Sequence, residues 1–410
     1  MSRAPLKAIV NAKRTSSLRR GCLAALAVVL AVGAAWCGEP AAAEPGVTED
    51  AVTFGQSAPL SGPGERSGRQ YRAGILAAFH EKNAEGGVHG RQLKLVTRDD
   101  GYEPNPAAAN ARQFIAENEV FAVVGSVGTP TAKRMLPIFR SAKIPFVGPF
   151  TGADFLRDAE RSPNVVNLHA GYQEEVELSV NHLYDHEGAR RFGIIYQDDA
   201  LGRSILKHFE DALTALSLPI LAKSSYSRNT HAVHGAAFVM AKADLDVVML
   251  GATSGVVTEI VNTATSLGHG YIIAVLSFIS MERLRVLVDD HDALVIATKV
   301  TPSLEDDNVA LVRRFRAALA AYREVDPGAK EREADSLSLK GYILGRFIIG
   351  VLERMPDELT REAFLEAALA PTPVHIDDWV VEFHEGTNVG SDYVRLEHLG
   401  GSERTRETGE

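Results

Sequence analysis

The stretch VFAVVGSVGTPTAKRMLPIFRSAKIPFVG, Val120 to Gly148, shows how this chain folds. It begins with a short apolar run, continues through glycines and hydroxyl residues into an amphipathic segment, and ends on a second apolar run. Short apolar runs on either side of a helix-length segment are typical of parallel strands joined by a helix. The stretch therefore predicts one strand–helix–strand unit.

The same alternation runs along the chain from Ala51 to Val300. Strands of about five residues that alternate with amphipathic helices indicate parallel sheets covered by helices on both faces. There are too many strands for one comfortable sheet, so we predict an α/β protein with two similar lobes. The 410 residues are 45% hydrophobic and 23% charged, a globular balance that excludes a disordered or fibrous chain.

The last third of the chain departs from this alternation. Three helical segments follow one another and two strand-like stretches come after them, at 377–386 and 392–399. The helices must pack on one lobe and the strands can complete the other sheet, so the chain is expected to cross between lobes three times. We place the crossings near 167–172, 297–302 and 373–377. The predicted division is lobe 1 at 44–168 and 300–373, lobe 2 at 169–299 and 374–398, and a disordered tail at 399–410.

The first 43 residues have the pattern of an export signal. Six basic residues precede the apolar run Gly21 to Ala35, and Ala41 and Ala43 stand at the spacing that signal peptidase recognises. The run is shorter than the roughly 20 apolar residues of a spanning helix. We predict a signal peptide over 1–43, with a membrane anchor, a twin-arginine signal and a lipid anchor as alternatives.

Removal of the signal would also remove both cysteines, Cys22 and Cys37. The remaining chain could then form no disulfide, thiol nucleophile or thiolate metal site. It would keep 37 basic and 52 acidic residues. Such an acidic surface disfavours nucleic acid and anionic lipid as partners.

The loop Gly125 to Ala132 is a candidate anion site. It lacks the lysine of a phosphate-binding P-loop and the GxGxxG of a dinucleotide loop. Its hydroxyl residues stand where a helix begins, and the free N–H groups and positive end of a helix favour a carboxylate. The alternative is that Thr129 is an N-cap and Pro130 the first helical residue.

A second polar loop follows the next strand and contains Phe150 and Thr151. In open α/β sheets, ligands bind beyond the carboxyl ends of the strands, so adjacent loops there support each other as one site. The alternative for Phe150 is core packing.

Catalytic and metal motifs are weak. The chain has no GxSxG or HExxH motif, and we expect no catalytic residue, metal or cofactor. His182 and His186 lie four residues apart on a predicted helix, which is compatible with a metal ion. Glu174, Glu175 and Glu177 on the same helix favour a solvated polar face instead.

The chain resembles the type I periplasmic substrate-binding proteins of ABC importers, in the leucine/isoleucine/valine-binding protein family. The matching stretches occur in the family's order along nearly the whole chain. The resemblance implies two Rossmann-like lobes joined by three crossover strands and closing on a ligand in the cleft between them. It rests on VTFGQSAPLSGPG, NAEGGVHGRQLKLVTRDDGYEPNPAAANARQFI, VFAVVGSVGTPT, IPFVGPFTGADFLR, IIYQDDALGRS, VVMLGATSGVVTEIVNTATSLG and SLSLKGYILGRFIIGVL.

The resemblance also implies site residues. The loop matching Gly125 to Thr131 binds the ligand carboxylate in relatives, which points to Thr129 first and Thr131 beside it. Amino-acid binders place an acidic residue where AVLSFIS stands here, so the partner of an ammonium group is missing. Positions matching family cleft aromatics carry Ser67, Leu201 and the ATS of Ala252 to Ser254. The full candidate set is Ser67, Ser126, Thr129, Thr131, Phe150, Thr151, Tyr172, Leu201, Thr253 and Ser277, with hinge packing as the alternative role for Tyr172.

Together these features predict a monomeric periplasmic binding protein that is not an enzyme. It is expected to capture a small carboxylate-bearing solute, an amino acid or a related acid, and deliver it to an ABC permease in the inner membrane. The alternatives are a domain that presents its solute to a membrane receptor and a secreted α/β enzyme.

Overall fold

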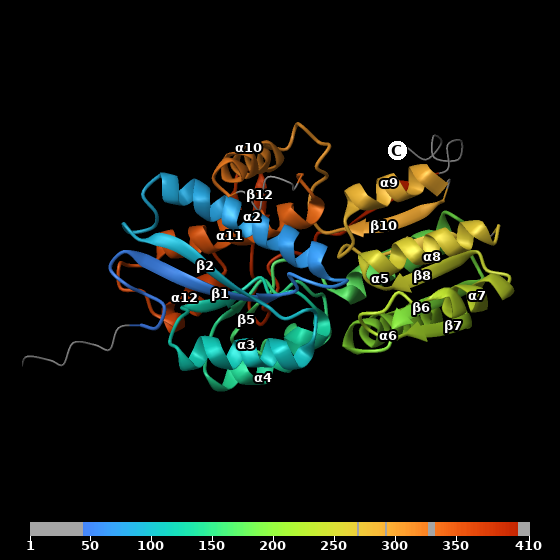
Figure 1. Ribbon diagram of the computed structural model, residues 1–410, viewed down its shortest axis with the longest axis horizontal. Helices are drawn as coiled ribbons and strands as arrows, with labels where there is room; N and C mark the ends of the chain where they lie inside the picture. Colours follow the sequence, from blue (N-terminus) through green and yellow to red (C-terminus); the bar gives the residue numbers. More distant parts are fainter. Residues whose placement is uncertain (1–43, 269, 292, 327–332, 401–410) are drawn as a thin grey trace, which may run out of the picture. The chain divides into compact units, whose positions relative to one another are not determined.

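The computed structural model describes residues 44–400 except 269, 292 and 327–332. The predicted signal peptide and residues 401–410 of the predicted tail lie outside the described residues. Two large sheets and one two-stranded sheet form the framework (Figure 1). Among the described residues, no helix is both long enough and apolar enough to cross a bilayer.

The first sheet has five strands in the order β2-β1-β3-β4-β5, and every pair is parallel. Its strand order reverses between β1 and β3. The chain passes from β1 to β2 on one side of β1 and then returns to place β3 on the other side. The strands are β1 (Ala51–Ala58), β2 (Gln92–Asp99), β3 (Ala122–Val124), β4 (Phe146–Val147) and β5 (Val165–Val166).

Helices cover both faces of this sheet, and each face has its own apolar core. One face carries α2 (Glu65–Ala84), α10 (Ala310–Val325), α11 (Ser336–Arg354) and α12 (Arg361–Leu369). The other carries α3 (Pro104–Ala116) and α4 (Thr129–Ser141), followed by the short η2 (Asp154–Leu156). We call this half lobe 1.

The second sheet has the order β13-β10-β9-β8-β6-β7 and reverses between β6 and β8. The helices α5 (Tyr172–Asp185) and α6 (Ala200–Ala215) cover one face, and α7 (His234–Lys242), α8 (Ser254–Ser266) and α9 (Met281–His291) cover the other. We call this half lobe 2. Its strands are β6 (Phe192–Gln197), β7 (Ile220–Tyr226), β8 (Val247–Gly251), β9 (Ile272–Val275), β10 (Val295–Lys299) and β13 (Arg395–Leu399).

The α/β fold class predicted from the sequence is thus confirmed, but one helix was overlooked. Helix α9 was not predicted from the sequence, although Met281, Leu284 and Val288 are buried at helical spacing.

The end of the chain differs from the predicted lobe division. β11 (Val374–Ile376) and β12 (Trp379–Val381) form a hairpin whose apolar side chains join the core that contains α11. Only β13 pairs with lobe 2, antiparallel to β10, and it includes Leu399 from the predicted tail. The third crossing lies after β12, where Val389 bridges Asn167 of the first crossing, instead of at 373–377. Burial against α11 explains why the hairpin stays with lobe 1.

Two glycines set the distance between α2 and α11. A Cβ atom at Gly74 would lie 1.9 Å from the backbone oxygen of Ser338, and one at Gly341 would lie 2.1 Å from that of Tyr71. The helix backbones therefore touch where any side chain would separate them.

Gly341→Ala should lower the free energy of unfolding by about 1–3 kcal/mol, because the added methyl group forces the two helices apart. Gly235→Ala in α7 is the matched control: a Cβ there meets nothing within 4 Å, and stability should rise by about 0.4–1 kcal/mol. Urea unfolding measures both. A Gly341→Ala protein as stable as wild type would contradict the close contact.

Candidate functional site

A cleft lies where the strand-order reversals of the two sheets face each other. Ligands bind at such reversals, beyond the carboxyl ends of the strands. The cleft spans about 400 Å³ of space unfilled by atoms, part of it open to solvent, and loops after β1, β3, β6 and β8 contribute to its walls. Its lining residues are Pro59, Gly64, Ser67, Tyr102, Val127, Gly128, Thr129, Phe150, Tyr172, Leu201, Thr253, Ser254 and Phe278.

The first turn of α4 opens into this cleft. Gly128 has a φ of 115°, a conformation that glycine adopts without strain, and a Cβ there would lie 2.6 Å from the ring of Tyr102. The residue before Gly128 forms a backbone bridge with Phe150. Among the described residues, no backbone acceptor bonds the N–H groups of Thr129 or Thr131. These donors stand at the positive end of the helix, which is the environment that an anion needs.

Three hydroxyl groups meet beside this helix end. Thr129 Oγ1 lies 2.8 Å from Thr151 Oγ1 and 3.1 Å from Tyr172 Oη. The N-cap of α4 is Gly128, so the N-cap interpretation of Thr129 is wrong and its hydroxyl is available to this cluster. Burial raises the pKa of Tyr172, which keeps its hydroxyl neutral. The cluster joins the lobes, because the threonines belong to lobe 1 and Tyr172 to α5.

The remaining walls are mostly apolar. They include the uncharged polar residues Ser67, Thr253 and Ser254. Phe150 packs on Tyr71 with ring centroids 4.9 Å apart, and Phe278 meets Tyr172 edge-on at 5.8 Å. Phe150 therefore belongs to the core and to the cleft at once. Within the described part of the chain, the lining has no Asp, Glu, Lys, Arg or His. An ammonium group in the cleft would find no carboxylate partner there.

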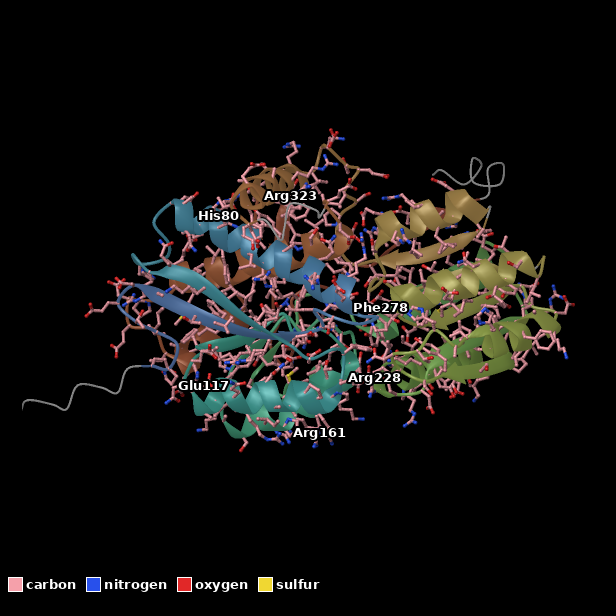
Figure 2. The ribbon with its side chains drawn as sticks, in the orientation of Figure 1. His80, Glu117, Arg161, Arg228, Phe278 and Arg323 are labelled. Atoms are coloured by element: carbon pink, nitrogen blue, oxygen red, sulfur yellow. The ribbon has the colours of Figure 1, made fainter. Side chains whose placement is uncertain are left out.

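Polar contacts between lobes close one edge of the cleft. Arg228, which follows β7 and is labelled in Figure 2, pairs with Glu103 at 2.8 Å and with Asp199 at 3.2 Å. Asn229 donates to the carboxylate of Glu103 at 2.7 Å and to the carbonyl of Gly101 at 3.1 Å. These contacts cross from lobe 2 to the loop that carries Tyr102, so they stabilise the closed arrangement.

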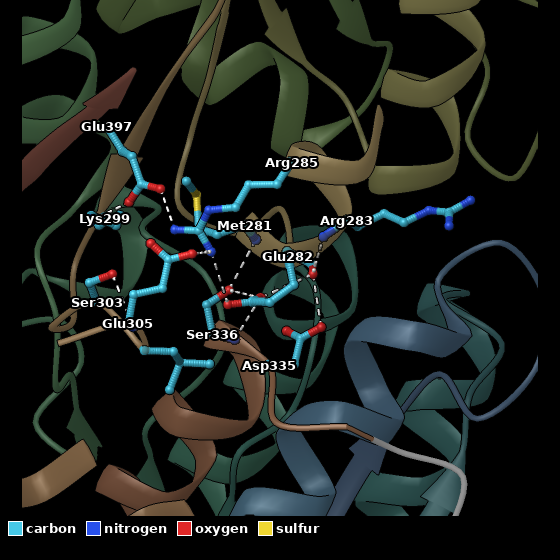
Figure 3. Close-up of polar contacts among 12 residues, drawn as sticks. Met281, Glu282, Arg283, Arg285, Lys299, Ser303, Glu305, Asp335, Ser336 and Glu397 are labelled. Carbon is cyan, nitrogen blue, oxygen red and sulfur yellow. Dashed lines mark hydrogen bonds and ion pairs between the residues drawn. The ribbon is translucent and has the colours of Figure 1, made fainter. Parts of the chain in front are cut away.

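A second set of contacts joins the starts of α9 and α11 (Figure 3). Asp335 caps α11 and accepts from Ser280 Oγ at 2.8 Å and from Arg66 at 2.6 Å. Glu282 accepts from the N–H of Ser336 at 3.0 Å. Burial raises the pKa of Glu282, and the nearby Asp335 adds to the rise. The lobes are thus tied together away from the cleft as well.

The structure brings six of the ten predicted site residues into the lining: Ser67, Thr129, Phe150, Tyr172, Leu201 and Thr253. Thr151 lies behind them in the hydroxyl cluster. Thr131 donates to the carbonyls of Val127 and Gly128, both at 2.9 Å, and so holds the loop rather than facing the cleft. Ser126 and Ser277 are buried outside the lining.

Several lining residues were not among the predicted site residues, and Tyr102 and Phe278 are the largest of them. Tyr102 follows the carboxyl end of β2 and Phe278 follows that of β9. An aromatic residue at such a position could have been predicted to line the site. Gly128 was part of the quoted loop, but its role as the helix N-cap depends on backbone geometry.

Ser277 takes part in a buried polar contact between lobes. Its N–H donates to Glu175 at 2.8 Å, and its hydroxyl lies 3.1 Å from Lys340 Nζ of α11. Thr298 also donates to Glu175, and Lys340 donates to the carbonyl of Ser277. Burial lowers the pKa of Lys340 to about 8. Glu175 is only 1% exposed, so the predicted solvated face is wrong for this residue.

Asp100 lies behind the cleft and shapes the loop of Tyr102. Its carboxylate accepts from Ser57 Oγ at 2.7 Å and from the N–H of Tyr102 at 2.9 Å. Burial raises its pKa from 3.8 to about 7. The folded protein therefore binds this proton more tightly than the unfolded chain.

Between pH 4 and 7 this difference should make the wild type lose stability as the pH rises. The contribution of Asp100 is complete below its unfolded pKa of 3.8 and is lost as the pH passes about 7. In Asp100→Asn, the fall in unfolding free energy between pH 5 and pH 8 should be smaller by roughly 1–3 kcal/mol. Urea unfolding at both pH values measures it, and equal pH dependence in both proteins would contradict the assignment.

The chain is similar in sequence and in structure to proteins of a known family. Leu/Ile/Val-binding protein homolog 7 of Brucella abortus (strain 2308) is 28% identical over 206 residues, 48% of this chain and 51% of that protein. The chain thus spans about half the length of the curated relatives it matches. The crystal structure of a possible leucine/isoleucine/valine-binding protein from Rhodopirellula baltica SH 1 matches with a TM-score of 0.78 and 28% identity, covering 89% of this chain and 99% of that one.

A solute-binding protein of an ABC transporter from R. palustris, solved in complex with benzoate, shares the fold at 17% identity. Its TM-score is 0.75, over 86% of this chain and 94% of that one. Residues 51–383 match the family model described as periplasmic binding protein. The resemblance seen in the sequence is therefore confirmed, and the chain belongs to the periplasmic binding proteins, among relatives of the Leu/Ile/Val-binding type.

Proposed function

We propose that this protein captures a small monocarboxylic acid with an uncharged, largely apolar body and delivers it to an ABC permease. Its family consists of solute-binding proteins, so no chemical step is required. One observation carries the proposal: free N–H groups and neutral hydroxyls meet in a cleft whose other walls are mostly apolar and whose described lining has no charge.

The cleft separates the two ends of such a ligand. The carboxylate would accept from Thr129 and from the free N–H groups at the start of α4. The body would lie against Phe150, Phe278 and Leu201, which bury apolar surface. A ligand held by both lobes favours the closed state over the open one, which couples binding to closure. Micromolar affinity would correspond to roughly −8 kcal/mol.

Because the described lining of the cleft has no acidic residue, an acid without an ammonium group is favoured over the amino acid that the sequence also allowed. An ammonium group that leaves water without a partner costs several kcal/mol. An α-amino acid would incur this cost in the cleft, whereas a simple acid would not. The R. palustris neighbour was solved with benzoate, which makes aromatic acids worth testing. Its likeness to this chain shows the fold alone and does not identify the ligand.

Isothermal titration of the chain from residue 44 tests the proposal with benzoate, hexanoate, isoleucine, glutamate and benzamide. We expect an acid with an uncharged body to bind most tightly, and its amide to bind about 10–100-fold more weakly because it lacks the charge that the N–H donors stabilise. The proposal would be contradicted if an amino acid bound most tightly, or if none of the acids bound.

Transport and export need tests in cells. The proposed signal peptide predicts that the exported protein begins at Glu44, which N-terminal sequencing checks. If the protein serves an importer, a strain that lacks it should lose uptake of the bound acid. Unchanged uptake, with a lost transcriptional response to the acid, would favour the receptor-presenting alternative.

A further inference from the structure

Three imidazole rings and a carboxylate gather on lobe 2, away from the cleft. His182 lies near the end of α5, His186 caps that helix, and Glu187 follows it. His398 comes from β13, the edge strand that arrives after the third crossing. The ring of His182 stacks on His186 and meets His398 edge-on, with centroids 4.9 Å apart in both cases.

The ligating atoms of three of these residues converge. Glu187 Oε1 lies 3.8 Å from His182 Nε2 and 3.8 Å from His398 Nδ1, and the three atoms all lie within 4.8 Å of one another. A tetrahedral zinc ion has bonds of about 2.0–2.2 Å, which place its ligand atoms about 3.3–3.6 Å apart. The two Glu187 distances would shorten by about half an ångström or less, and the two histidine nitrogens would approach by at most about 1.5 Å, to reach that spacing.

The state of His182 supports a ligand at this point. Its Nε2 atom is buried, and among the described residues it has no hydrogen-bond partner. A buried polar atom without a partner is costly, and a neutral imidazole nitrogen is a common metal ligand. At 3.8 Å, Glu187 is too far to accept a hydrogen bond from it. A cation between the three residues would satisfy all of them.

We propose that His182, Glu187 and His398 form a binding site for a divalent transition metal ion, with Zn²⁺ as the ion that two imidazoles and a carboxylate suit best. None of the three lines the cleft, so the site is separate from the proposed ligand site. Because it joins the end of α5 to β13, the ion would fasten the returning end of the chain to lobe 2. Three protein ligands leave a fourth position for water.

From the sequence, His182 and His186 were a metal-compatible pair on this helix, and a solvated polar face was predicted for them. The structure replaces that pair with a different set, because Glu187 and His398 supply the other ligand atoms. The fold brings His398 to α5 through the pairing of β13 with β10. No local spacing could have shown this.

Titration of the chain from residue 44, purified without a polyhistidine tag, tests the site with ZnCl₂. We expect one ion per chain with a dissociation constant in the micromolar range or below, and a higher melting temperature with Zn²⁺. His398→Ala and Glu187→Gln should each weaken binding at least about tenfold. His375→Ala is the matched control, an exposed histidine of β11 that should leave affinity unchanged.

Cobalt gives a second readout, since Co²⁺ in a tetrahedral nitrogen and oxygen site absorbs visible light. That band should appear in the wild type and in His375→Ala and be absent in His398→Ala. Circular dichroism shows whether each variant is folded. Binding no tighter than about 100 μM, or equal affinity in wild type, His398→Ala and Glu187→Gln, would overturn the proposal. These outcomes do not depend on which acid the cleft binds.

Discussion

Thr129→Val should weaken binding of the tightest acid of the titration series by about 10–100-fold. Valine keeps the shape of threonine and removes a hydroxyl that lines the cleft and meets Thr151 and Tyr172. A hydrogen bond to a charged group contributes about 1.5–3 kcal/mol, which gives that range. The loss should appear for the acid and be much smaller for its amide, because the amide carries no charge.

Thr129→Ser is the matched control, since it keeps the hydroxyl and removes a methyl group. Its affinity should stay within about threefold of wild type. Thermal melts of both variants separate a lost contact from lost folding. If Thr129→Val binds the acid as tightly as wild type does, Thr129 does not hold the carboxylate.

Lys340→Met should lower the free energy of unfolding by about 1.5–3 kcal/mol, because the buried carbonyl of Ser277 loses its charged donor. Lys340 is 6% exposed and donates to the carbonyl of Ser277, whose N–H donates to Glu175. Methionine fills similar space without the charge, so Glu175 would also be left buried without its nearby cation. The contact also links α11 of lobe 1 to the end of β9 in lobe 2.

The double variant Lys340→Met with Glu175→Gln distinguishes this cause from simple loss of packing. Removing both charges should recover part of the lost stability, because coupled groups are not additive. Lys94→Met, on an exposed position of β2, should change stability by less than about 0.5 kcal/mol. A double variant no more stable than Lys340→Met would show that the buried charge is not part of the cause.

Local patterns were enough to predict the two α/β lobes. The alternation of short apolar runs and amphipathic helices is a property of neighbouring residues, so the sheets and most helices could be read along the chain. The loop Gly125 to Thr131 was visible for the same reason, since its glycines and threonines adjoin a strand and a helix.

What the sequence analysis missed depends on contacts between distant segments. Whether the 374–383 hairpin packs on lobe 1 or lobe 2 is decided by its burial against α11. The hydroxyl of Thr131 turns to two backbone carbonyls, and Glu175 enters the interior beside Thr298. Neither choice follows from residue type or spacing. Each depends on which partners the folded chain places within reach.

A crystal structure of the protein with its tightest-binding acid would test the central claim most directly. The account predicts a carboxylate oxygen within hydrogen-bond distance of Thr129 Oγ1 and of an N–H group at the start of α4, with the body of the acid against Phe150 and Phe278. An acid bound outside the cleft, or one whose carboxylate points toward lobe 2, would contradict it.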